Sequence, residues 1–174
     1  MKVIAFAATN SKNSINKKLV NFATSLLEGH EVEILDLNDY ELPLFSVDRE
    51  AELGKPSLAQ AFVDKIADCD GLVISFAEHN GCYSAAYKNL FDWCSRINPK
   101  VYQDKPMVLL STSPGPRGGA SVLELACTQM PFFKGHVKAS LSVPSFHDNF
   151  DKEQGVLTHT EIAQQVKSAV QALF

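Results

Sequence analysis

The stretch that decides the fold reads Gly71-Leu72-Val73-Ile74-Ser75-Phe76, then Ala77-Glu78-His79-Asn80-Gly81-Cys82-Tyr83-Ser84, then Ala85-Ala86-Tyr87-Lys88-Asn89-Leu90-Phe91-Asp92-Trp93. The first six residues form a short apolar run, which is typical of a parallel strand buried on both faces. The next eight are mostly polar and include a glycine, and apolar residues then recur at helical spacing. Open α/β sheets bind ligands at the carboxyl ends of their strands, so this stretch predicts a strand, a ligand-binding loop and a helix.

Further strands and helices alternate along the rest of the chain. Strands are expected at 2–8, 31–37, 106–111 and 137–143, in addition to 71–76. The expected helices are an apolar stripe ended by Gly29, one capped by Ser57 that runs to about 67, one ended by Pro99, one at 120–130, and one capped by Thr158 that runs to 173. Residues 38–56 and 144–155 are expected to be polar connections, the first longer than compact domains usually need.

Strand–helix alternation predicts an α/β fold with a doubly wound parallel sheet and helices on both faces, in one domain over residues 1–174. The strand order 2-1-3-4-5 would bring together the loops that follow strands one, three and four. These are loop one (9–16), loop two (77–84) and loop three (113–119), and each is polar or rich in glycine. Their predicted convergence indicates a nucleotide-sized ligand.

Composition excludes several classes of function. The net charge is −4 with no basic block, which argues against nucleic acid as a partner. The four cysteines show no zinc or redox spacing, and the five histidines show no metal-ligand spacing. The first strand pattern begins at Lys2, and no stretch is apolar enough to cross a bilayer. We therefore expect a cytoplasmic protein without a signal peptide, a metal site or a membrane span.

Loop one has the chemistry of an anion site. Thr9, Ser11 and Ser14 supply hydroxyl groups, and free backbone amides follow at the start of the next helix. An equally open interpretation is a capping cluster that binds nothing, because Ser14 alone would cap that helix. Neither the nucleotide P-loop motif nor the dinucleotide glycine motif is present.

All three loops resemble those of the NAD(P)H-dependent FMN reductase family, the flavodoxin-like group of quinone, chromate and azo reductases. Loop two and its helix resemble the family's Pro-Glu-Tyr-Asn-Gly-Ser-x-Pro-x-x-Leu-Lys-Asn-x-x-Asp-Trp, with Ala77 and Ser84 at the proline positions and His79 at the tyrosine. Loop one resembles Gly-Ser-x-Arg-x-x-Ser-x-Asn, with Ala8 for the glycine and Ser11 for the arginine. Loop three resembles Ser-x-Gly-x-x-Gly-Gly. The Leu-Pro-Leu-Phe run at 42–45 also resembles a family segment near the dimer interface.

The resemblance implies a flavodoxin-like, FMN-dependent oxidoreductase that takes a hydride from NADPH or NADH. The electron acceptor would be free flavin, a quinone, an azo dye or a metal oxyanion, and the assembly a homodimer or homotetramer. The implied cofactor-binding residues are Thr9, Ser11, Ser14, Ile15, Asn16, Glu78, His79, Asn80, Gly81, Ser113, Pro114, Gly115 and Gly118. Loss of the phosphate-loop arginine at Ser11 implies either weaker FMN binding than in relatives or compensation by the neighbouring Lys12.

Several roles stay open at the level of sequence. His79 is a candidate for a catalytic or flavin-stacking role or a surface residue. Glu78 is expected to be structural, bonded to Lys88 or a backbone amide, because hydride transfer to a flavin needs no protein base. Lys88 and Asp92 have the spacing of an ordinary helical ion pair. Arg117 would meet a nucleotide phosphate or lie in solvent.

Two alternatives to the reductase share the same fold. One is a flavodoxin-like electron carrier, and the other is a non-catalytic domain that has lost FMN. Flavodoxins usually flank the ring with aromatic residues and have a strongly acidic surface. Trp93 lies within a predicted helix and the net charge is only −4, so both observations favour the reductase.

Overall fold

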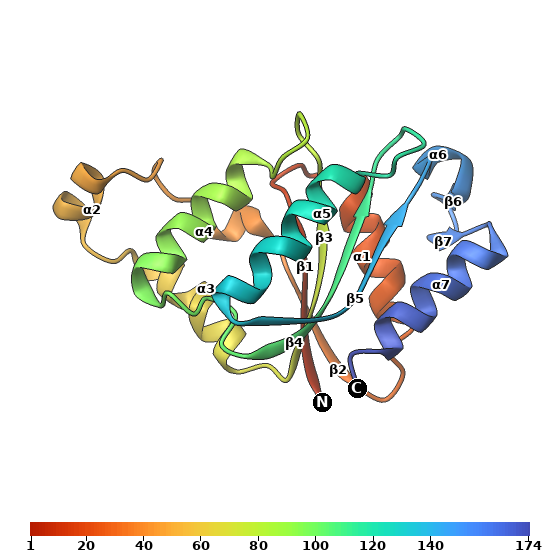
Figure 1. Cartoon of the computed structure of the whole chain (residues 1–174), viewed down its shortest axis with the longest axis horizontal. Helices are drawn as coiled ribbons and strands as arrows, with labels where there is room; N and C mark the ends of the chain where they lie inside the picture. The colour runs from red at the N-terminus through yellow and green to blue at the C-terminus, as the bar shows by residue number, and fades with distance from the viewer.

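A computed structural model describes all residues, 1–174. A five-stranded sheet lies at its centre, with helices on both faces (Figure 1). The elements in order are β1 (Lys2–Ala8), α1 (Ile15–Ser25), β2 (Glu31–Leu35), η1 (Leu37–Tyr40), α2 (Val47–Leu53), α3 (Ser57–Ala67), β3 (Gly71–Phe76), α4 (Ala85–Ile97), β4 (Lys105–Thr112), α5 (Ala120–Gln129), η2 (Met130–Phe133), β5 (Gly135–Val143), α6 (Phe146–Asn149), β6 (Phe150–Asp151), β7 (Val156–Leu157) and α7 (Thr160–Gln171).

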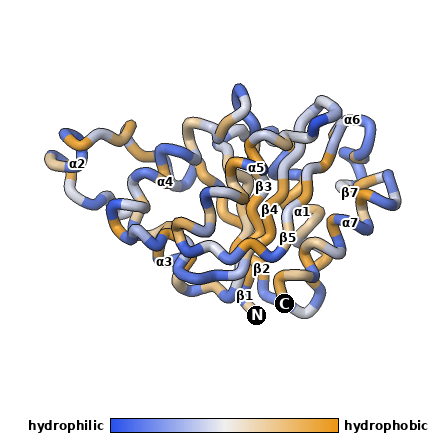
Figure 2. The backbone as a smooth tube through the Cα atoms, in the orientation of Figure 1, coloured by the Kyte–Doolittle hydropathy of each residue, from blue (hydrophilic) through white to orange (hydrophobic).

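The predicted strand order is confirmed. All pairings in the main sheet are parallel, and the order is β2-β1-β3-β4-β5. Side chains alternate between the faces of β1: Ile4 and Phe6 pack with α3, α4 and α5, whereas Val3 and Ala5 pack with α1 and α7. The inner strands β1, β3 and β4 are covered on both sides and form the hydrophobic centre of Figure 2, whereas the edge strands β2 and β5 are partly exposed. This burial explains why the sequences of β1, β3 and β4 read as continuous apolar runs.

The connection after β2 differs from the expectation. The predicted strand 31–37 ends at Leu35, because Asp36 turns the chain and caps η1 by accepting a bond from the Asn38 amide. The predicted connection 38–56 contains η1 and the short helix α2. Helix α2 buries no residue and projects away from the sheet (Figure 1). Because no residue of α2 is buried, its sequence contains no apolar stripe from which the helix could be predicted.

Two predicted helix caps are wrong. Helix α3 does begin at Ser57, but Pro56 occupies the cap position and no side chain caps the helix. Helix α7 begins at Thr160 after His159, not after Thr158, and ends at Gln171. Gly29 does adopt a left-handed backbone, with φ of 78°, but α1 has already ended at Ser25. The expected connection 144–155 also includes α6 and β6.

No helix in the structure combines the length and the apolar character that crossing a membrane requires.

Candidate functional site

The three predicted loops meet where β1, β3 and β4 end. They surround a cavity of about 260 Å³, here called the loop cavity. Its lining residues are Thr9, Ser11, Asn13, Ser14, Ile15, Asn16, Ala77, Glu78, His79, Thr112, Ser113 and Pro114. Most of the predicted cofactor-binding residues are therefore brought together. Asn80, Gly81, Gly115 and Gly118 lie in the same loops but do not line this cavity.

Loop one presents a row of free backbone amides. Ser14 caps α1, since its Oγ accepts bonds from the amides of Asn16 at 3.1 Å and Lys17 at 3.3 Å. Thr9 Oγ1 accepts from the Ser11 amide at 3.2 Å. The amides from Lys12 to Ile15 donate to no acceptor in the protein. Unpaired amides before a helix N-terminus are what an anion such as a phosphate requires.

Asn16 braces the loops from inside. Its Oδ1 accepts from Ser75 Oγ at 2.8 Å and from the Thr112 amide at 3.0 Å, and its Nδ2 donates to the Thr112 carbonyl at 3.1 Å. The side chain is buried and ties α1 to the ends of β3 and β4. These bonds leave the Asn16 side chain one free donor hydrogen. Its main effect is therefore to hold the start of α1 against the ends of β3 and β4.

Loop two contains a tight turn. His79 and Cys82 exchange backbone hydrogen bonds of 2.9 and 3.1 Å, and Asn80 and Gly81 between them have φ of 53° and 77°. Positive φ at both central positions defines the turn type for which Asn-Gly is preferred. Asn80 and Gly81 therefore form the tip of the loop, while Glu78 and His79 face the loop cavity.

Glu78 joins loop two to the start of α5, the helix that follows loop three. Its Oε2 accepts a hydrogen bond of 3.0 Å from the amide of Val122, in the first turn of α5. Gly119 at the start of α5 has no side chain to cap the helix, so Glu78 supplies the cap from a different loop. Of the two expected partners, the backbone amide is confirmed. Lys88 instead pairs with Asp92, with an N–O distance of 2.7 Å.

Loop three is shaped by close backbone contacts. At Gly118, φ is 58°, and a Cβ atom would lie 2.5 Å from Ser142 Oγ and 2.6 Å from the Val143 carbonyl. Gly118 is thus required by packing against β5. Gly115 has open space around it, and only Ser113 Oγ lies within 4.0 Å of a Cβ placed there. The Arg117 guanidinium donates to Ser121 Oγ at 3.0 Å and is exposed.

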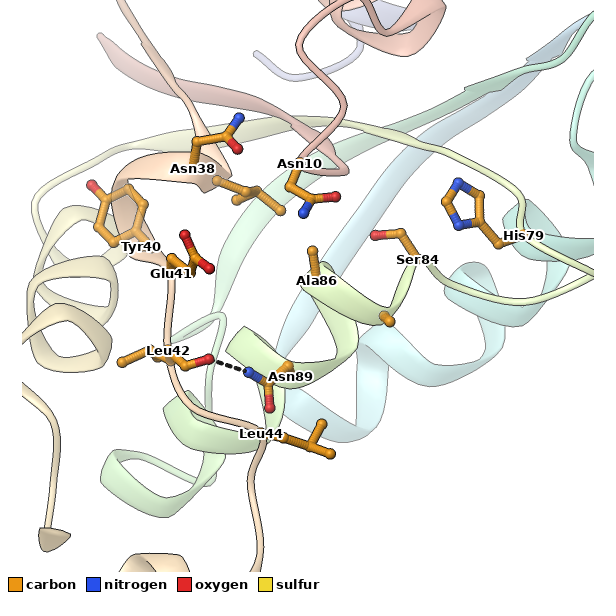
Figure 3. Close-up of a pocket in the computed structure, with 12 residues that line it drawn as sticks. Asn10, Asn38, Tyr40, Glu41, Leu42, Leu44, His79, Ser84, Ala86 and Asn89 are labelled. Carbon is orange, nitrogen blue, oxygen red and sulfur yellow. Dashed lines mark hydrogen bonds between the residues drawn. The ribbon is translucent and has the colours of Figure 1, made fainter.

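A second cavity of about 330 Å³ lies beside the first and is here called the side cavity (Figure 3). His79 lines both cavities. The other lining residues are Asn10, Leu37, Asn38, Tyr40, Glu41, Leu42, Leu44, Ser84, Ala85, Ala86 and Asn89. None except His79 was predicted as a site residue. The sequence signals were the long connection after β2, which supplies one wall, and the Leu-Pro-Leu-Phe run at 42–45 within it.

The two cavities contain few ionisable side chains. The two cavities together contain the carboxylates of Glu41 and Glu78, the His79 imidazole and the Tyr40 phenol. Burial raises the pKa of Tyr40. Behind loop two, burial also raises the pKa of Tyr87 and Tyr102, which bond to one another. These phenols are neutral over the physiological range, and no nucleophile–base pair like that of a hydrolase is formed.

Comparison with known proteins agrees with this geometry. The model of a family described as NADPH-dependent FMN reductase matches residues 1–148.

The chain belongs to the NADPH-dependent FMN reductase family.

Individual relatives support the assignment. A probable NADPH:quinone oxidoreductase 1 of Oryza sativa is 30% identical over 182 residues, covering 99% of this chain and 90% of that protein. An NADPH:quinone oxidoreductase of Arabidopsis thaliana is 33% identical over 129 residues, covering 72% of this chain but only 64% of that protein. The solved structure of the flavoenzyme NAD(P)H:(acceptor) oxidoreductase FerB of Paracoccus denitrificans has a TM-score of 0.77 at 23% identity, covering 99% and 94% of the two chains.

Family membership confirms the predicted flavodoxin-like fold and the oxidoreductase class. FMN is the cofactor that the family implies, and NAD(P)H is the electron donor. The residues present fit FMN. Loop one offers unpaired amides for a phosphate, and the loop cavity extends from these amides to loops two and three. Ser11 stands where the resembled family motif has an arginine, so loop one contains no arginine.

Proposed function

We propose that this reductase uses FMN to pass electrons from NADPH or NADH to a quinone, with free flavin as a second acceptor. The observation that carries the proposal is the convergence of loops one, two and three on one cavity at the edge of the sheet. The named quinone oxidoreductases among its relatives support the choice of acceptor. We further propose that residues 1–174 form one domain.

The chain positions the cofactor rather than supplying reactive groups. The amides from Lys12 to Ile15 hold the phosphate, and Ser14 orients them by capping α1. Glu78 and His79 of loop two, with Ser113 and Pro114 of loop three, border the space for the ring. When bound, FMN supplies the chemistry of accepting a hydride and delivering electrons. The protein contributes orientation, and no side chain needs to transfer a proton to the reacting atoms.

An electron carrier is the second candidate, and two observations disfavour it. Trp93 is fully buried, and its Nε1 donates to the Pro43 carbonyl at 2.8 Å, so it does not flank a ring. The loop cavity contains no Phe, Tyr or Trp side chain. Without an aromatic cover, a flat ring has an open face on which a nicotinamide or a quinone can stack. A domain that has lost FMN is disfavoured by the unpaired amides of loop one.

We also propose that the protein acts in the cytoplasm as a homodimer or homotetramer, without a membrane or nucleic-acid partner. Helix α2 and the residues before it support self-association, because Leu44, Val47 and Leu53 are 79%, 73% and 51% exposed. Light scattering of the purified protein tests this. A monomeric mass would contradict it, and Leu44→Asp combined with Val47→Asp is expected to weaken the assembly.

The decisive experiment measures FMN binding and turnover in the same preparation. The purified protein is titrated with FMN and then mixed anaerobically with NADPH or NADH. We expect FMN binding, bleaching of the flavin absorption by a pyridine nucleotide, and NADPH consumption that depends on an added quinone. A bound flavin that neither nucleotide reduces would favour the electron carrier. Failure to bind FMN would overturn the enzyme proposal.

A further inference from the structure

The side cavity adjoins the cofactor site through a single residue. His79 lies on loop two and lines both cavities. A ring held along loop two would therefore reach the side cavity past His79. A second reactant in contact with that ring has this space beside it.

One wall of the side cavity is fixed in place. Asn89 Nδ2 donates to the carbonyls of Leu42 and Pro43 at 3.0 and 3.1 Å, and Asn89 Oδ1 accepts from the Phe45 amide at 2.8 Å (Figure 3 shows the bond to Leu42). The Trp93 indole donates to Pro43 as well, and the Phe45 ring packs edge-on against it at 5.1 Å. The segment 42–45 is therefore fastened to α4. A wall held in this way forms a cavity before any ligand arrives.

The lining of this cavity is half apolar and contains one carboxylate. Leu37, Leu42 and Leu44 supply apolar surface, and Glu41 is the only acidic side chain in the lining. The Glu41 carboxylate forms no ion pair and accepts no hydrogen bond from the protein. The cations on neighbouring α4 are already paired, Lys88 with Asp92 and Arg96 with Glu50. Glu41 is therefore an unpaired carboxylate at the solvent-exposed side of this cavity.

We propose that the side cavity binds the electron acceptor and that Glu41 selects uncharged planar acceptors over anionic ones. The inference rests on the proposed function. It excludes metal oxyanions and sulfonated dyes as preferred acceptors, because an unpaired carboxylate repels them at close range. Uncharged quinones combine a flat apolar ring with oxygens that can accept from the side-chain amide of Asn38, which keeps one free hydrogen. Glu41 acts as a specificity residue and takes no part in electron transfer.

The test compares a naphthoquinone with its sulfonated analogue. Dissociation constants for both are measured on the FMN-loaded protein without NADPH, and kcat/KM is then measured with NADPH at low and high salt. Glu41→Gln is expected to shift the preference toward the anionic quinone by roughly 3- to 10-fold at low salt, with a smaller shift at high salt. Glu41→Lys is expected to shift it further. Glu52→Gln on exposed α2 is the matched control and should leave the preference unchanged.

The outcomes separate this inference from the proposed function. If neither quinone supports NADPH consumption in the unaltered protein, the proposed function fails and this inference with it. If both quinones are reduced but neither Glu41 variant changes the preference in binding or turnover, only the inference about Glu41 is overturned. A shift of equal size in Glu52→Gln would also overturn it, since the effect would then come from net charge.

Discussion

The carboxylate of Glu78 caps α5 through the amide of Val122, at 3.0 Å, although the two residues are 44 positions apart in the chain. The bond joins loop two to the first turn of α5, next to the loop cavity. It also explains how α5 begins at a glycine without a cap of its own. Loop geometry and helix stability are thus linked through one side chain.

Glu78→Ala should lower the free energy of unfolding by about 1 kcal/mol, because an amide in the first turn of α5 loses its acceptor. Glu78→Gln keeps an acceptor oxygen and should cost less. Urea unfolding measures both. Glu124→Ala, at an exposed position of the same helix, serves as the control. Equal stability of Glu78→Ala and the unaltered protein would show that the cap is not needed.

Asn16→Ala should destabilise the protein by roughly 2–4 kcal/mol, since it strands the Ser75 hydroxyl and both backbone groups of Thr112 in a buried site. Chemical denaturation provides the measurement. Asn21→Ala, exposed on the same helix, should change stability by about 0.5 kcal/mol or less. Similar values for the two variants would contradict the bracing role of Asn16.

Two glycines of loop three should respond differently to alanine. Gly118→Ala places a Cβ within 2.6 Å of β5 at a positive φ, and should cost roughly 2–4 kcal/mol. Gly115→Ala meets no atom closer than 4.0 Å and should alter stability by about 0.5 kcal/mol or less. Thermal unfolding of both variants checks this. A tolerated Gly118→Ala would mean that loop three moves away from β5 at little cost.

Lowering the pH should remove the contribution that Asp36 makes to the free energy of unfolding. The hydrogen bond from Lys17, with a second from the Asn38 amide, lowers the pKa of Asp36 from 3.8 to about 2. A lowered pKa stabilises the folded protein above pH 3.8, and the stabilisation is lost as the pH falls from 3.8 toward 2. Because the pair is about one third exposed, we expect about 1 kcal/mol.

Unfolding free energies at pH 7 and pH 3 test this contribution. The Asp36→Asn variant should be less stable than the unaltered protein at pH 7. The difference between their free energies of unfolding should be smaller at pH 3. Asp39→Asn, a nearby exposed carboxylate without an ion pair, is the control. If the difference in unfolding free energy does not change with pH, ionisation of Asp36 is not its source.

Ser11→Arg should tighten FMN binding by roughly 5- to 10-fold at low salt, because a guanidinium is added beside the free amides of loop one. Ser11→Gln has a comparable length without the charge and should show little change. Fluorescence titration with FMN at two salt concentrations measures both. Equal effects of Arg and Gln would mean that contact area, not charge, limits the affinity.

Much of this protein was determined by local sequence pattern. The buried runs at β1, β3 and β4 and the polar loops after them were predicted correctly, because the hydrophobic period of an element is written in neighbouring residues. The strand order and the meeting of three loops were expected from the doubly wound fold class that this alternation indicates. The cap at Ser14 and the Lys88–Asp92 pair are also local, and both were predicted correctly. The resemblance of the loops to family motifs then indicated that the cofactor is FMN.

Contacts between distant segments were decided by the tertiary structure alone. The links from Glu78 to Val122, from Asn16 to Ser75 and from Asn89 to Pro43 connect residues that no period in the sequence relates. The same holds for the side cavity, whose wall comes from a connection without a hydrophobic period of its own. Two polar groups form a hydrogen bond only when the packing of their elements brings them close enough. Their separation therefore depends on the whole fold.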